Sequence, residues 1–206
     1  MIHLVLKFFP LPFFIGVLFL MVILTILRRR KSSFSYLFFF SVFWIYLLCV
    51  MGFTLFPVPI IRDPSGGSAF RQSAFILSRI NWAPFDFSQF RHLNPTFVFI
   101  REIVANILLT IPFGFGICFI FQIRAKYIPL LALAVGVGIE TTQLVMCLAL
   151  DTPYRGVDIN DVILNALGAM LGYGLFRGFS WLFVKVIRRY MLEPKGIFAY
   201  MYTITN

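Results

Sequence analysis

The segment VGVGIETTQLVM, residues 135–146, places a glutamate inside an otherwise apolar run. Glu140 and Gln143 are three residues apart, so they lie on one face of a helix. An ionisable side chain inside a membrane span indicates a functional role by default, because lipid does not solvate it. Two such roles fit: Glu140 acts as an acid or base towards a lipid-linked substrate, or both residues bind a ligand. A polar clamp between helices is the structural alternative, and all three interpretations stay open at this point.

Two other apolar runs carry polar stripes with helical spacing. In the first run the residues recur at i, i+4 and i+8, and they are Glu102, Asn106 and Thr110. In the second run they recur at i, i+3 and i+7, and they are Asp158, Asp161 and Asn165. We expect Arg155, in the short loop before the second stripe, to pair with these acids or to bind an anionic headgroup. We therefore predict a single cavity, open to the outer leaflet and lined by Asn106, Glu140, Gln143, Arg155, Asp158, Asp161 and Asn165.

If the protein is an enzyme, its expected catalytic residues are Glu140, Asp161 and Arg155, with Arg155 binding a phosphate. The sequence contains no G-x-S-x-G, H-E-x-x-H or phosphate-loop motif. No cofactor and no metal site are expected. The alternative is a divalent cation at Asp158 and Asp161, whose oxygens suit Mg²⁺ or Ca²⁺.

The composition identifies lipid as the solvent of most of this chain. Of its 206 residues, 60% are hydrophobic and 27 are Phe, more apolar surface than a soluble domain of this length can bury. Runs long enough to span a membrane cover residues 11–27, 34–56, 103–122, 128–149 and 160–184. The prediction is an all-α, polytopic membrane helical bundle of five transmembrane helices, folded as one domain over residues 1–206.

Basic residues predict the orientation of the bundle. The net charge is +10, and Lys and Arg cluster in residues 28–31, 124–126 and 185–189. Cytoplasmic loops of membrane proteins carry such an excess, so residues 28–31 and 185–206 are predicted to be cytoplasmic. The N-terminus is then outside and the C-terminus inside the cell membrane. The charge indicates orientation and contact with anionic lipid, not nucleic-acid binding.

The long loop between the second and third spans, residues 57–102, is rich in aromatic side chains. Its segment FILSRINWAPFDFSQF, residues 75–90, is predicted to lie at the outer membrane interface or to re-enter the membrane.

Four sequence motifs resemble those of the VanZ-like membrane proteins. They cover about residues 80–175 and are NWAPF (81–85), NILLTIPFGF (106–115), ETTQ (140–143) and RGVDINDVILNALGAMLG (155–172). By this resemblance the family's motif positions fall on Asn81, Pro84, Asn106, Pro112, Gly114, Glu140, Gln143, Arg155, Asp158, Asp161, Asn165 and Gly168. Asn81 thereby joins the expected ligand-binding residues.

The resemblance implies a multi-span protein of Gram-positive cell envelopes. The namesake of the family is associated with reduced susceptibility to teicoplanin, a lipid-bearing glycopeptide antibiotic. The expected partners are therefore membrane lipids, a lipid-linked cell-wall precursor or the lipoglycopeptide itself. The alternatives are a membrane-embedded enzyme that modifies a lipid-linked envelope substrate with Glu140 as acid or base, and a scaffold or small transporter.

Overall fold

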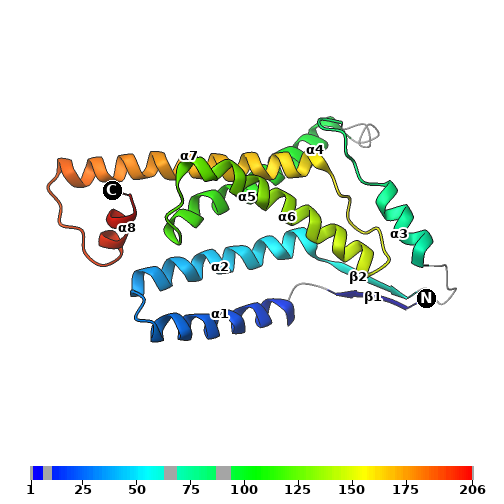
Figure 1. The fold of residues 1–206 in the computed structure, drawn as a ribbon, viewed down its shortest axis with the longest axis horizontal. Coiled ribbons are helices and arrows are strands. Elements are labelled where there is room, and N and C mark those ends of the chain that lie inside the picture. Colours follow the sequence, from blue (N-terminus) through cyan, green and yellow to red (C-terminus); the bar gives the residue numbers. More distant parts are fainter. Residues whose placement is uncertain (1, 7–10, 63–68, 87–93, 206) are drawn as a thin grey trace.

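The computed structural model describes residues 2–6, 11–62, 69–86 and 94–205. Within these residues, five helical segments are long and apolar enough to cross a membrane, which confirms the predicted all-α membrane bundle. They run roughly along the long axis of the molecule in Figure 1. They are α1 (Leu11–Arg29), α2 (Phe34–Leu55), a composite span over Pro95–Phe119, α6 (Ile128–Ala149) and α7 (Ile159–Arg189).

The composite span changes its helical geometry along its length. It begins with α4 (Pro95–Val98), continues through a π-helical stretch (Phe99–Val104) into α5 (Ala105–Gly116), and ends in a 3₁₀ turn (Ile117–Phe119). Pro112 lies inside α5, where it removes one backbone donor. The hydroxyl of Tyr46, on α2, donates to the carbonyl of Leu109 at 2.6 Å and so ties α2 to this part of the span.

The helix α7 is the central element, because both α5 and α6 pack on it (Figure 1). Small residues let the backbones approach closely, as is usual where membrane helices meet. A Cβ atom at Gly172 would overlap the carbonyl oxygen of Ile111, and one at Gly136 would overlap that of Val162. The hydroxyl of Thr110 donates across the same contact to the carbonyl of Asn165 at 2.7 Å.

The helices α1 and α2 form an antiparallel pair beside this unit (Figure 1). Ser33 caps α2 by accepting a hydrogen bond from the amide of Tyr36, and the indole of Trp44 donates to the carbonyl of Gly16 at 3.0 Å. Large apolar side chains of this pair face outwards, for example Leu18 at 65% exposure and Phe53 at 76%. Such surfaces suit lipid as the solvent.

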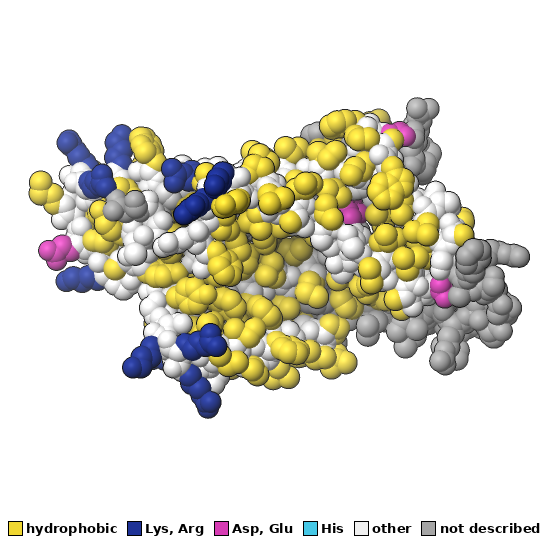
Figure 2. Space-filling view, in the orientation of Figure 1, with side chains coloured by type: hydrophobic (Ala, Val, Ile, Leu, Met, Phe, Trp, Pro, Cys, Tyr) yellow, Lys and Arg dark blue, Asp and Glu magenta, His cyan; other side chains and the backbone are white. Residues whose placement is uncertain are grey.

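The two ends of the bundle differ in charge. We call the end where α7 begins the acidic end, for its buried carboxylates, although arginines such as Arg79 and Arg155 balance their charge, and the end where α7 finishes the basic end. Figure 2 shows Lys and Arg side chains gathered at the basic end, where α1 finishes with Arg28 and Arg29 and α7 with Arg188 and Arg189.

A short helix, α8 (Ile197–Thr205), folds back beside the basic end of α7 (Figure 1). The hydroxyl of Tyr200 donates to the carbonyl of Phe119 at 2.6 Å, and its ring stacks on Phe39 with centroids 5.6 Å apart. Burial raises the pKa of this hydroxyl above its ordinary value, so it stays a donor. A segment predicted to be cytoplasmic thus contains a helix that was not predicted from the sequence.

The acidic end contains three further elements that the sequence did not predict. The strands β1 (Ile2–Leu6) and β2 (Val58–Arg62) pair antiparallel, from Ile2 with Arg62 to Leu6 with Val58. The helix α3 (Ala69–Ser78) follows in the long loop. Five-residue strands that pair across more than fifty positions leave no periodic signal in either segment.

The boundaries of two spans differ from those predicted. The third begins at Pro95 and ends at Phe119, whereas hydropathy predicted residues 103–122. The fifth continues to Arg189 and not to residue 184, because a helix keeps its hydrogen bonds beyond its apolar part.

A pair of alanine substitutions tests the close packing of α7. Gly172→Ala inserts a methyl group against the backbone of Ile111, and we expect a loss of about 1–3 kcal/mol from overpacking. Gly174→Ala is the matched control, because no atom lies within 4 Å of the position of its Cβ. Thermal unfolding in detergent measures both, and equal melting temperatures for the two variants would contradict this packing.

Candidate functional site

Asp158 is the point at which three parts of the acidic end meet. Its side chain caps α7 by accepting from the amide of Asn160 at 2.8 Å. The side-chain amide of Asn81 donates to both of its carboxylate oxygens, at 3.0 and 3.1 Å. The backbone amide of Asp158 in turn donates to the carboxylate of Glu140, on α6, at 3.1 Å.

The segment of residues 81–86, which we call the aromatic loop, is fastened to the start of α7. The backbone of Asn81 pairs with that of Asp158 as a parallel bridge, with bonds to the carbonyl of Val157 and from the amide of Ile159, both 3.0 Å. The side chain of Asn160 adds two more bonds, because it accepts from the amide of Phe85 and donates to the carbonyl of Asp86.

The aromatic loop is held in one conformation but exposes large apolar side chains. Trp82 is 72% exposed and Phe85 is 75% exposed. Phe85 has a φ of 61°, a left-handed backbone conformation that is strained for a bulky residue. Such strain persists only where surrounding contacts fix it, and it is common where a protein holds a ligand.

Glu140 is only 4% exposed and lies between α6 and the start of α7. Its face of α6 continues through Gly136, which brings the helix against the backbone of Val162. Its carboxylate accepts a hydrogen bond from the backbone amide of Asp158, the residue that caps α7. Glu140 therefore joins α6 to the start of α7, as a polar clamp between helices would, and its partner is a backbone amide.

The stripes on α5 and α7 also meet. The amide of Asn106 donates to the carboxylate of Asp161 at 2.6 Å and to the carbonyl of Glu102 at 2.9 Å. One turn deeper, Thr110 and Asn165 are both 1% exposed. The carbonyl of Asn165 accepts from Thr110, whereas its side-chain oxygen has no hydrogen-bond partner.

Arg155 and Gln143 lie apart from this cluster and cap the C-terminal end of α2. The guanidinium of Arg155 donates to the carbonyls of Phe53 and Phe56, at 3.3 and 2.6 Å. The amide of Gln143 donates to the carbonyl of Thr54 at 3.0 Å. Arg155 was expected to pair with the carboxylates or to bind an anionic headgroup. In the structure it donates to carbonyls that a helix end leaves open, and its positive charge suits the negative end of the helix dipole.

Tyr154 completes this cap, and its role was not predicted from the sequence. Its hydroxyl donates to the carbonyl of Leu55 at 3.4 Å. Burial raises the pKa of Tyr154 above its ordinary value, so the hydroxyl stays protonated and remains a donor. The available signal was its place beside Arg155 in a short loop, since Tyr and Arg both carry donors that can reach a helix end.

The expected site residues therefore form two groups. The first surrounds Asp158 and comprises Asn81, Asn106, Glu140, Asp158, Asp161 and Asn165, and the second, Gln143 and Arg155, reaches α2. Three hollows that the described residues line all lie at the basic end. The cavity expected at the acidic end stays a prediction.

The two carboxylates of the alternative cation site, Asp158 and Asp161, both accept hydrogen bonds from protein groups. In the described part of the chain, no three His, Cys, Asp or Glu side chains lie close enough together to hold an ion. Asp158 is also occupied as a helix cap and as the acceptor for Asn81.

Five apolar spans, a buried polar cluster and one basic end define a multi-pass α-helical membrane protein. Residues 43–184 match the VanZ/LLP1 family, and because this match covers more than half of the sequence, the chain belongs to that family. Comparison with curated proteins gave no match, and comparison with solved structures gave none either.

The fastening of the aromatic loop can be tested by proteolysis. Asn81→Ala removes the bonds to Asp158 and Asp86, so we expect chymotrypsin to cleave faster after Trp82 or Phe85. Asn94→Ala is the matched control, because the side chain of Asn94 accepts a local hydrogen bond from the amide of Thr96 at 2.8 Å. Cleavage at the same rate in both variants and the wild type would show that the side chain of Asn81 does not hold the loop.

Proposed function

We propose that this protein binds lipid-bearing molecules at the outer surface of the cell membrane and thereby lowers susceptibility to teicoplanin. The candidate ligands are an outer-leaflet lipid headgroup, a lipid-linked wall precursor and the lipid tail of the antibiotic. The observation that carries this proposal is the aromatic loop, which is fixed to α7 yet exposes Trp82 and Phe85.

Trp82 and Phe85 suit this role because aromatic rings favour the level of lipid headgroups. Large rigid side chains lose little conformational entropy on binding, so a loop already held in place binds more tightly than a mobile one. Beneath the loop, Asn81, Asn106 and Asp161 are only half-buried, whereas Asp158 and Glu140 are buried and occupied by protein groups. The loop would contact the apolar part of a ligand, and the half-buried side chains its polar part.

The proposed orientation puts the acidic end outside. Lys and Arg gather at the opposite end, where α1 and α7 finish, and basic residues of membrane proteins remain on the cytoplasmic side. The chain would then begin outside with β1 and finish inside with α8. A precursor or antibiotic arriving from outside would meet the aromatic loop first.

We propose binding rather than catalysis because the carboxylate of Glu140 already accepts the backbone amide of Asp158. An acid or base must reach the atom whose proton it moves. Arg155, the expected phosphate ligand of an enzyme, is likewise engaged by the carbonyls of Phe53 and Phe56. These contacts favour a structural role for both residues.

Drug susceptibility of a Gram-positive host with and without the gene tests the proposal. We expect the gene to raise the inhibitory concentration of teicoplanin but not that of vancomycin, which lacks the lipid tail. Trp82→Ala removes an exposed aromatic contact and should return the host towards its original susceptibility, whereas Tyr190→Ala, 71% exposed at the basic end, should not.

The same assay separates binding from catalysis. Glu140→Gln keeps an oxygen acceptor for the amide of Asp158, so a binding protein should retain most of its effect. Loss of the effect in a folded Glu140→Gln protein, together with altered envelope lipids by mass spectrometry, would favour the membrane-embedded enzyme. An unchanged teicoplanin response with the gene present would refute the resistance proposal.

A further inference from the structure

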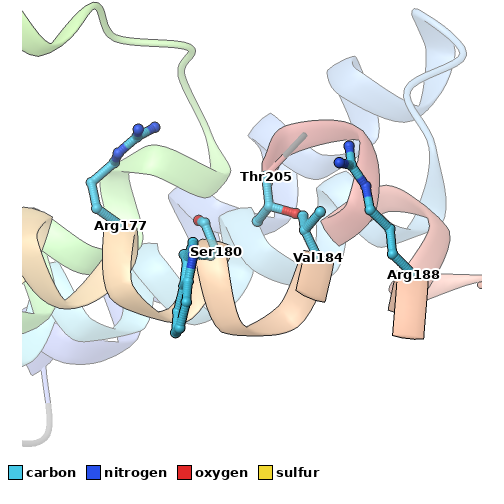
Figure 3. Close-up of a pocket in the computed structure, with 6 residues that line it drawn as sticks. Arg177, Ser180, Val184, Arg188 and Thr205 are labelled. Atoms are coloured by element: carbon cyan, nitrogen blue, oxygen red, sulfur yellow. The ribbon is translucent and has the colours of Figure 1, made fainter. Parts of the chain in front are cut away.

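A small cavity at the basic end lies between α7 and α8 and carries two arginines. Its volume is about 250 Å³, and it is lined by Arg177, Ser180, Trp181, Val184, Arg188 and Thr205. Figure 3 shows the side chains of Arg177 and Arg188 on either side of Ser180 and Thr205, leaving α7 on the side of α8. This volume lies below the roughly 300–1,000 Å³ of pockets for drug-sized ligands, so a small anionic group fits it better.

Ser180 provides the second, independent observation. It is 4% exposed, and its hydroxyl has no hydrogen-bond partner. Hydroxyls within membrane helices ordinarily bond back to their own helix. Thr25, Ser41 and Thr142 all do so here, to the carbonyls of Met21, Leu37 and Gly138 at 2.7–2.8 Å. Ser180 lines the cavity with its buried hydroxyl unpaired, and an unpaired buried hydroxyl is costly unless a ligand pairs it.

The depth of the cavity identifies the source of the anion. The hydrocarbon core of a bilayer is about 30 Å thick, which about 20 residues of helix span. If the hydrocarbon begins at the start of α7, at Ile159, about twenty residues of helix bring its other boundary near Ser180 and Trp181. Trp181 is 65% exposed, and tryptophan favours this boundary. The two arginines thus bracket the level of the lipid phosphates.

We propose that this cavity binds the phosphate group of an anionic phospholipid in the adjacent leaflet. Arg177, one turn from Ser180 on α7, neutralises the phosphate, and the hydroxyl of Ser180 donates to one of its oxygens. Arg188, about three turns beyond Arg177 on α7, adds positive charge on the headgroup side of the cavity. The neighbouring hollow, which shares Arg177, has apolar walls that include Phe121, Ile123 and Ile204, where the lipid glycerol and chains can lie. A second neighbouring hollow, which shares Arg188, adds Lys185 and Arg189. This site is separate from the aromatic loop and does not depend on the proposed resistance function.

Binding of phosphatidylglycerol to the full-length protein in detergent, followed by native mass spectrometry, tests the site. We expect retention of phosphatidylglycerol, no retention of diacylglycerol with the same chains, and no competition by inorganic phosphate. Arg177→Gln should weaken binding about tenfold, because it removes a charge-assisted contact. Ser180→Ala should weaken it about threefold to tenfold while leaving thermal stability intact, since the hydroxyl has no protein partner.

Two matched controls complete the experiment. Arg29→Gln removes the same charge at the basic end of α1, and Ser41→Ala removes a hydroxyl that bonds to its own helix, so neither should change binding. If Arg29→Gln weakened lipid binding as much as Arg177→Gln, diffuse charge attraction and not this site would account for the binding. Unchanged binding in Ser180→Ala, or binding of inorganic phosphate in place of the lipid, would also overturn the proposal.

Discussion

The N-terminus of α7 needs acceptors for its free amides, and Asp158 provides the first of them. Asp158 is only 7% exposed, so its carboxylate needs donors, and the side-chain amide of Asn81 supplies two hydrogen bonds. The amide of Asp158 needs an acceptor as well and finds Glu140. The hydrogen bonds of the Asp158 carboxylate and backbone amide therefore determine both the position of the aromatic loop and the packing of α6 on α7.

The backbone groups at the end of α2 also need hydrogen-bond partners. A helix that finishes near a membrane interface leaves its last carbonyls without helical partners. Here the carbonyls of residues 53–56 are satisfied by Arg155, Gln143 and Tyr154. Because Gln143 belongs to α6 and the other two to the loop before α7, the cap joins the α1–α2 pair to the α5–α7 unit. Two residues expected to bind ligand thus hold the bundle together.

The sequence predicted the spans well because their signal is local: twenty apolar residues indicate a helix wherever they pack. It also identified the polar residues on α5, α6 and α7, since their cost in lipid and their helical spacing are visible in the sequence. It could not assign their partners. Arg155 bonds to backbone carbonyls about one hundred residues earlier, and every residue carries a carbonyl, so nothing in the sequence marks Phe53 and Phe56. The β1–β2 pair and α8 were missed for the same reason, because distant contacts stabilise short segments.

The central claim is that the polar cluster around Asp158 holds Trp82 at the level of the outer lipid headgroups. Labelling of Trp82→Cys in intact cells, with a membrane-impermeant maleimide that carries a polarity-sensitive fluorophore, tests it most directly. The background variant Cys49→Ser removes the exposed native thiol, and Tyr190→Cys serves as the control at the basic end. The account predicts that position 82 is labelled, with emission between those of water and hydrocarbon, and that position 190 is labelled only after the cells are opened. Labelling of position 190 but not of position 82, or a water-like emission at 82, would contradict it.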